Sequence, residues 1–94
     1  DEFSEIREEI ARATAKFPAW PNDPLHAMAV LQEEVGELTQ AVLDASYDFV
    51  TAETINQIRR EAIQVAAMAV RFLASVNRYQ YKPAPNHVQG ESHV

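Results

Sequence analysis

The sequence contains no cysteine and only two glycines among its 94 residues. Without thiols, disulfide bonds and thiolate chemistry are excluded, and the redox compartment stays open. No apolar run approaches the roughly 20 residues that a membrane-spanning helix needs. The first residues, Asp1 to Glu5, are acidic and unlike a signal peptide. We therefore expect a soluble, cytoplasmic protein with no membrane partner.

Basic residues are also scarce, with 8 Lys and Arg against 14 Asp and Glu and a formal net charge of −6. Nucleic acids and anionic membrane surfaces attract proteins that carry basic patches. This balance argues against nucleic acid as the main partner. A ligand that carries phosphate groups would need a metal ion to bridge it to the chain.

Ninety-four residues suffice for one hydrophobic core and are too few for two. Apolar residues recur at helical spacing over residues 3–16, which predicts an amphipathic helix. Three prolines within residues 18–24 end that helix. Asp23 followed by Pro24 predicts the start of a second helix, because Asp caps free amides and Pro suits the first helical position. We expect this helix to reach about Ala45.

A third helix is predicted from Ala52 to Arg78, after a turn over residues 46–51 in which Asp48 or Thr51 provides the cap. Between residues 61 and 76 this helix is apolar almost all round. A helix that is apolar on every side must be covered on every side, and two short companions can hardly do that. We therefore expect an all-α fold, a helical hairpin plus an N-terminal helix, completed to a four-helix-bundle-like core by homo-oligomerisation.

That oligomer should be a homodimer or a dimer of dimers whose interface includes the helix from Glu61 to Val76. Residues 82–94 contain two prolines and a glycine and show no periodicity. Such a composition is typical of an extended or disordered tail. We accordingly assign residues 1–81 to a single helical domain.

Three carboxylates fall within five residues at Glu33, Glu34 and Glu37. Residues on a helix advance about 100° each, so Glu34 lies at the edge of the apolar stripe that contains Leu31 and Val35. A half-buried carboxylate is costly unless a cation, a hydrogen-bond donor or protonation compensates it. A divalent metal ion would do so, although this spacing of glutamates is also common on solvated helix faces.

Glu61 and Gln64 repeat the spacing of three on the next helix. Two antiparallel helices joined by a short turn can point this pair toward Glu34 and Glu37. Oxygen ligands of this kind suit Mg²⁺, with Mn²⁺ possible, whereas zinc is disfavoured without Cys or a close His pair. The sequence therefore predicts a magnesium site between the second and third helices.

The motif Glu33-Glu34-x-x-Glu37 followed by Glu61-x-x-Gln64 resembles the metal-binding signature of the MazG-like all-α nucleoside triphosphate pyrophosphohydrolases, over roughly residues 20–76. The resemblance implies a Mg²⁺-dependent hydrolase that releases a nucleoside monophosphate and pyrophosphate, in house-cleaning of the nucleotide pool. It makes Glu34, Glu37 and Glu61 metal ligands and gives Glu33 a catalytic role toward the attacking water. Gln64 stands where the family pattern has Asp, and its amide oxygen would coordinate without a charge.

Five further residues are candidates for substrate binding. Phe17 and Trp20 precede the acidic helix, where their rings would either stack on a nucleobase or cover the core. His26 shares a helix stripe with Glu33 and either faces the site or is solvated. Arg60 and Arg71 would stabilise the pyrophosphate; the alternatives are a solvated Arg60 and an Arg71 paired with an acid in the dimer.

Two other functions stay open. One is a non-catalytic α-helical oligomerisation or regulatory module of the same fold, for which Gln64 would mark the lost ligand. The other is a hydrolase of a different pyrophosphate, such as phosphoribosyl-ATP. The sequence names neither the base nor the sugar.

Overall fold

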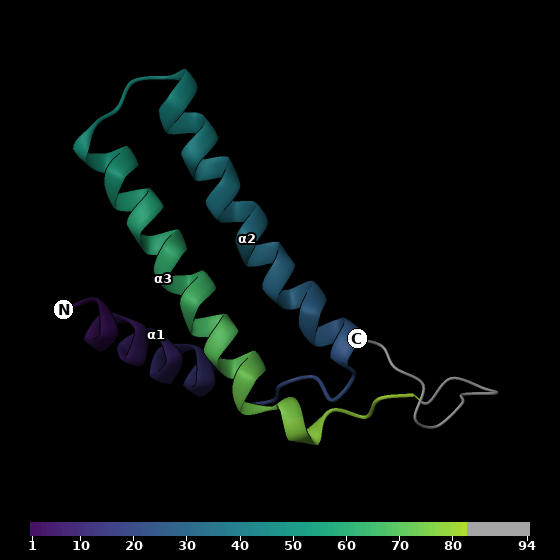
Figure 1. Ribbon diagram of the computed structural model, residues 1–94. Helices are drawn as coiled ribbons and strands as arrows, with labels where there is room; N and C mark the ends of the chain where they lie inside the picture. Colours follow the sequence, from purple (N-terminus) through teal and green to yellow (C-terminus); the bar gives the residue numbers. More distant parts are fainter. Residues whose placement is uncertain (83–94) are drawn as a thin grey trace, which may run out of the picture.

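The computed structural model describes residues 1–82, which form helices and contain no strand. The elements are α1 (Glu2–Lys16), α2 (Pro24–Tyr47), α3 (Ala52–Ala74) and a 3₁₀ turn, η1 (Val76–Arg78). Helices α2 and α3 lie antiparallel as a hairpin, and α1 lies against α3 (Figure 1). The prediction of an all-α fold is confirmed. The predicted tail, apart from Lys82, falls outside the described residues.

The helices begin at side-chain caps that the sequence signals. Asp23 accepts a hydrogen bond from the Leu25 N–H at 2.9 Å, with proline at the first helical position, as predicted. Thr51 caps α3 through a capping box with Thr54. Asp48, the other predicted cap, ends α2 instead, where its N–H donates to the Asp44 carbonyl at 2.9 Å. Helix α2 is therefore two residues longer than expected.

Helix α3 ends at Ala74, so the prediction that it continues to Arg78 is wrong. The Phe72 carbonyl, which would accept from the residue 76 amide in a longer helix, instead accepts from Ser75 N–H at 3.2 Å and Tyr79 O–H at 3.1 Å. Tyr79 is buried, at 6% exposure. The chain turns here because the buried Tyr79 side chain bonds to the Phe72 carbonyl in the last turn of the helix.

Helix α3 is central because both other helices pack against it, whereas α1 does not pack against α2. Arg59 near the start of α3 pairs with Glu5, and Arg71 near its end donates to the Phe17 carbonyl at 2.7 Å. Helix α1 thus runs in the same general direction as α3. Because α1 and α2 do not contact each other, a pocket opens between α1 and the first half of α2. The candidate site lies at this pocket.

The interior is built from small side chains. All buried residues of α2 are alanines, namely Ala27, Ala41 and Ala45. On the α1 side, Ala13, Ala67 and Met68 form a cluster, and no large side chain in residues 1–82 is fully buried. The Cα radius of gyration is 17.1 Å, against about 12 Å for a compact domain of this length. The single chain is therefore open and elongated.

Large apolar side chains remain on the surface. Leu73 on α3 is 69% exposed, and Tyr47 and Phe49 at the hairpin turn are 84% and 85% exposed. None of the helices in residues 1–82 has both the length and the apolar character needed to cross a membrane.

Candidate active site

The hairpin brings three predicted metal ligands together. Helix α2 supplies Glu34 and Glu37, α3 supplies Glu61, and one carboxylate oxygen from each lies within 4.8 Å of the others. Oxygens bound to one Mg²⁺ at 2.0–2.1 Å lie about 3–4 Å apart. The three carboxylates therefore need to move toward one another only slightly to share one ion, and their hard oxygen donors fit Mg²⁺.

The electrostatics of this cluster centre on Glu34, which is half-buried between the two helices. Its burial raises the pKa of the Glu34 carboxyl, and the neighbouring charges of Glu37 and Glu61 raise this pKa further. Both causes disfavour the ionised form. A cation bound by the three carboxylates would remove the repulsion, so the cluster as it stands favours positive charge.

Gln64 lies between two of these carboxylates. With its NH₂ group turned toward them, it donates to Glu34 Oε2 and to Glu61 Oε1, each at 3.1 Å. Glu61 also accepts from Gln57 Nε2 at 2.6 Å. Rotating the Gln64 amide by half a turn presents its oxygen instead, and an amide oxygen is a Mg²⁺ ligand. The same side chain can thus join the carboxylates by hydrogen bonds or add a fourth oxygen.

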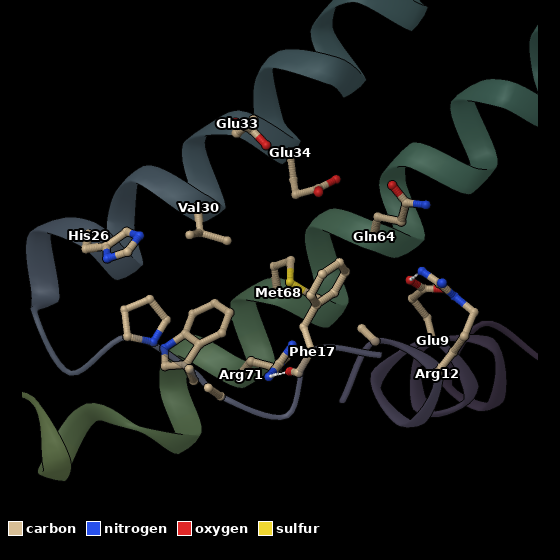
Figure 2. A pocket seen from close by; sticks show the side chains of 14 residues that line it. Glu9, Arg12, Phe17, His26, Val30, Glu33, Glu34, Gln64, Met68 and Arg71 are labelled. Atoms are coloured by element: carbon tan, nitrogen blue, oxygen red, sulfur yellow. Dashed lines mark hydrogen bonds and ion pairs between the residues drawn. The ribbon is translucent and has the colours of Figure 1, made fainter. Parts of the chain in front are cut away.

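A pocket of about 440 Å³ opens beside Glu34 and Gln64, between α1, α3 and the start of α2 (Figure 2). This volume is in the range of small-molecule sites. The pocket borders the carboxylate cluster at Glu34 and Gln64, and its lining also contains aromatic and apolar side chains. Its lining consists of Glu9, Arg12, Ala13, Phe17, Ala19, Trp20, Pro21, His26, Val30, Glu33, Glu34, Gln64, Met68 and Arg71.

The two predicted aromatic residues play different parts in this pocket. Trp20 packs against the cluster of Ala13, Ala67 and Met68, and its indole N–H donates to Tyr79 Oη at 2.8 Å. Its ring therefore covers the core, which was one of the two expected roles. Phe17 lines the same pocket but is 61% exposed, so its ring is accessible for stacking.

Arg71 holds the segment between α1 and α2 in place. Its guanidinium lies 4.9 Å from the centroid of the Trp20 ring and donates to the Phe17 carbonyl at 2.7 Å. Both expected roles, the pyrophosphate ligand and the partner of an acid in a dimer, stay predictions, because these contacts lie within one chain. Arg71 lines the pocket, but its position is fixed by the aromatic residues around it.

The remaining predicted residues divide between two hollows. His26 and Glu33 are exposed side chains of α2 and line the pocket. Arg60 lies outside it, in a neighbouring hollow between α1 and α3, and donates to Gln57 Oε1 at 2.5 Å. Since Gln57 in turn donates to Glu61, Arg60 is linked to the carboxylate cluster through one intervening side chain.

Sequence reasoning missed three residues near the site, Glu9, Arg12 and Gln57. Glu9 and Arg12 looked like part of the solvated face of an amphipathic helix, and only the packing of α1 on α3 places them on the pocket wall. Gln57 carries a usable signal: it lies four residues before Glu61, a spacing at which an amide reaches a carboxylate on the same helix.

Comparison with known proteins leaves the family open. The chain matches no protein-family model, no curated protein and no solved structure. The resemblance to MazG-like pyrophosphohydrolases therefore rests on the motif residues alone, and the function is argued from the site.

Proposed function

We propose that the chain is a Mg²⁺-dependent nucleoside triphosphate pyrophosphohydrolase, which releases a nucleoside monophosphate and pyrophosphate in house-cleaning of the cytoplasmic nucleotide pool. One observation carries this proposal. The three carboxylates Glu34, Glu37 and Glu61 converge beside a pocket that Glu34 helps to line, and the aromatic residues Phe17 and Trp20 line the same pocket. A nucleotide combines groups that suit both features, a metal-binding polyphosphate and a flat apolar base.

Glu34, Glu37 and Glu61 would hold the ion, with the Gln64 amide oxygen as a weaker fourth ligand. Bound Mg²⁺ offsets the negative charge of phosphate oxygens and lowers the pKa of a coordinated water. The chain itself contributes the half-buried position of Glu34, which keeps bulk water from solvating that carboxylate fully. This position favours metal binding over exchange with solvent.

Glu33 is the proposed catalytic residue, because it is exposed on the pocket wall beside Glu34. It would orient the attacking water and accept its proton. The water oxygen bonds to the α-phosphorus, the bond from that phosphorus to the α,β-bridging oxygen breaks, and pyrophosphate leaves. Phe17, whose ring lies beside Met68 on the side toward Gln64, would stack on the base, and His26 lines the opposite end of the pocket (Figure 2).

The proposed assembly is a homo-oligomer, a dimer or a dimer of dimers, joined through residues 61–76. The open single chain supports it, since Val70 and Leu73 of this stretch are 42% and 69% exposed. Sedimentation velocity tests it: the wild type should sediment as a dimer or larger, and Leu73→Asp should shift it toward the monomer. Leu25→Asp, at a leucine that is 79% exposed on α2, is the matched control. A monomeric wild type would overturn this part of the proposal.

The activity is tested by measuring pyrophosphate released from a panel of ribo- and deoxyribonucleoside triphosphates, with and without Mg²⁺. We expect Mg²⁺-dependent release that is abolished in Glu37→Gln, because one ligand charge is lost. Glu37 is exposed, so the variant should keep its helical circular dichroism. Glu53→Gln, at an exposed position in the first turn of α3, is the control and should turn over normally. No release from any triphosphate would refute this activity.

A specific contact also favours the second candidate, a non-catalytic helical oligomerisation or regulatory module. The Gln64 amide can satisfy Glu34 and Glu61 by itself, so the cluster is able to persist without a metal. Under this alternative the wild type would be folded and oligomeric yet would bind no Mg²⁺. Mg²⁺ binding without release from any nucleoside triphosphate would instead favour another pyrophosphate substrate, such as phosphoribosyl-ATP.

A further inference from the structure

An ion pair on α1 forms part of the pocket wall. Arg12 Nε donates to Glu9 Oε1 at 2.9 Å and Arg12 Nη2 donates to Glu9 Oε2 at 2.5 Å, a two-pronged pairing three residues apart on one helix. The Glu9 side chain is only 14% exposed, whereas that of Arg12 is 57% exposed. The carboxylate is thus held against the protein, and it orients a guanidinium that remains accessible.

The pair stands where two hollows meet. Glu9, Arg12 and Gln64 line both the pocket described above and the neighbouring hollow that contains Arg60. Figure 2 shows Glu9 and Arg12 on the side of the pocket occupied by Gln64, with His26 at the opposite end. Arg12 therefore lies on the side of the pocket where Gln64 contacts the carboxylate cluster.

The Arg12 guanidinium has N–H groups that the pairing with Glu9 does not use. A guanidinium carries five N–H groups, and the pairing with Glu9 uses one on Nε and one on Nη2. Among the hydrogen bonds of residues 1–82, those to Glu9 are the only ones that the Arg12 side chain makes. The two N–H groups of Nη1 and the second of Nη2 stay available, and they form the planar fork that matches two oxygens of a phosphate.

The other arginines near the pocket are engaged differently. Arg71 donates to the Phe17 carbonyl and lies over the Trp20 ring. Arg60 donates to Gln57, outside the pocket. Since three carboxylates, Glu9, Glu33 and Glu34, line the same pocket, a polyphosphate entering it meets negative charge. A cation of the protein would offset part of that charge beside the metal ion, and Arg12 has three unengaged N–H groups for this role.

We propose that Arg12 binds a phosphate group of the polyphosphate ligand through its free guanidinium edge, with Glu9 as the positioning residue that orients it. This proposal rests on the proposed function and deepens it, because it assigns the substrate's phosphate end to α1. The pairing with Glu9 persists on binding, since the two ligands use different edges of the guanidinium. The chemical class recognised is a pyrophosphate or triphosphate, whatever base is attached.

Calorimetric titration of the full chain with inorganic pyrophosphate tests the proposal without requiring turnover. The variants are Arg12→Gln, which removes the charge, and Arg12→Lys, which keeps the charge but loses the fork. Arg7→Gln is the matched control, because Arg7 is an exposed arginine of α1 that donates to Ser4 and lines neither hollow. Circular dichroism checks the helical content of each protein.

We expect Arg12→Gln to weaken pyrophosphate binding by about 10- to 100-fold, the loss typical of a hydrogen-bonded charge. Arg12→Lys should weaken it less, and Arg7→Gln should leave it unchanged. The proposal is overturned if Arg12→Gln binds as tightly as Arg7→Gln, or if the wild type binds no pyrophosphate. The failure of the proposed function is a separate result, namely no release of pyrophosphate from triphosphates by a wild type that binds pyrophosphate.

Discussion

Replacing Glu34 by Gln should stabilise the protein in the absence of metal and remove its response to Mg²⁺. The substitution keeps the size of the side chain and removes a negative charge from the cluster with Glu37 and Glu61. Two unit charges at 4.8 Å repel by about 0.9 kcal/mol in water and by about 3.5 kcal/mol at an effective dielectric constant of 20. The cluster is only half-buried, so the smaller value applies to each pair.

The two charge pairs that involve Glu34 lower the stability of the folded state by about 1–2 kcal/mol. The Gln64 amide offsets part of this repulsion through its two hydrogen bonds. For a domain of this size, 1 kcal/mol changes the melting temperature by about 4–8 °C. In a chelator at neutral pH, we therefore expect Glu34→Gln to melt about 5 °C above the wild type. Glu8→Gln, at an exposed position on α1, should change the melting temperature little.

The sign of the pH dependence follows from the raised pKa of Glu34. The folded state holds this proton more tightly than the unfolded state, so stability falls as the pH rises from the ordinary range of glutamate toward the raised pKa. The advantage of Glu34→Gln should accordingly be present at neutral pH and fade below about pH 4, where the carboxyl becomes protonated in the unfolded state as well.

Adding Mg²⁺ should reverse the order of the two melting temperatures, so that the wild type melts above Glu34→Gln. At ten times its dissociation constant, a ligand stabilises the folded state by about 1.4 kcal/mol. The wild type should gain this stability, whereas the variant, which lacks one ligand charge, should gain much less. Thermal melts at two pH values, with chelator or with Mg²⁺, measure all these quantities. A variant that is less stable than the wild type in chelator at neutral pH, or one that Mg²⁺ stabilises equally, would refute the reasoning.

Two further changes test neighbouring contacts. Gln64→Asp should bind Mg²⁺ more tightly than the wild type because it adds a ligand charge, while lowering stability in chelator; an unchanged Mg²⁺ affinity by calorimetry would remove Gln64 from the site. Tyr79→Phe removes the hydroxyl that accepts from the Trp20 indole N–H and donates to the Phe72 carbonyl. The loss should lower the free energy of unfolding by about 1–3 kcal/mol, measured in a thermal or urea melt followed by Trp20 fluorescence. Tyr47→Phe, at an 84% exposed ring, is its control, and equal melting of the two variants would contradict the structural role of Tyr79.

Much of the fold is predictable because it depends on neighbours in sequence. Apolar periodicity locates all three helices, and Asp23 and Thr51 cap helices in the structure as local sequence indicates. The end of α3 is not predictable in this way. It depends on Tyr79 reaching back to Phe72 and out to Trp20, a contact 59 residues away in sequence. Apolar periodicity alone continues the helix because it contains no information about that contact.

The candidate site is likewise predictable from the sequence only where it depends on spacing within a helix. The spacing of the glutamates predicts that carboxylates of α2 and α3 face one another, and the structure places Glu34, Glu37 and Glu61 together. The position of Arg71 over Trp20 depends on how the segment after α1 folds back, 51 residues away in sequence. Similarly, Glu9 and Arg12 reach the pocket because of the face that α1 turns toward α3. Helix packing decides such contacts, and spacing within one helix does not.

One feature of the sequence, the small residues at the helix contacts, accounts for both the carboxylate cluster and the exposed apolar surface. Alanines are the only buried residues of α2, so that helix can approach α3 closely enough to bring Glu34 and Glu61 together. Few large side chains are buried between the helices, and residues such as Leu73 remain exposed. Burial of these residues by a second copy would contribute stability of about 25 cal/mol for each Å² of apolar surface covered. The repulsive, half-buried carboxylates lower stability, and we therefore expect the oligomer to be the form in which this site is maintained.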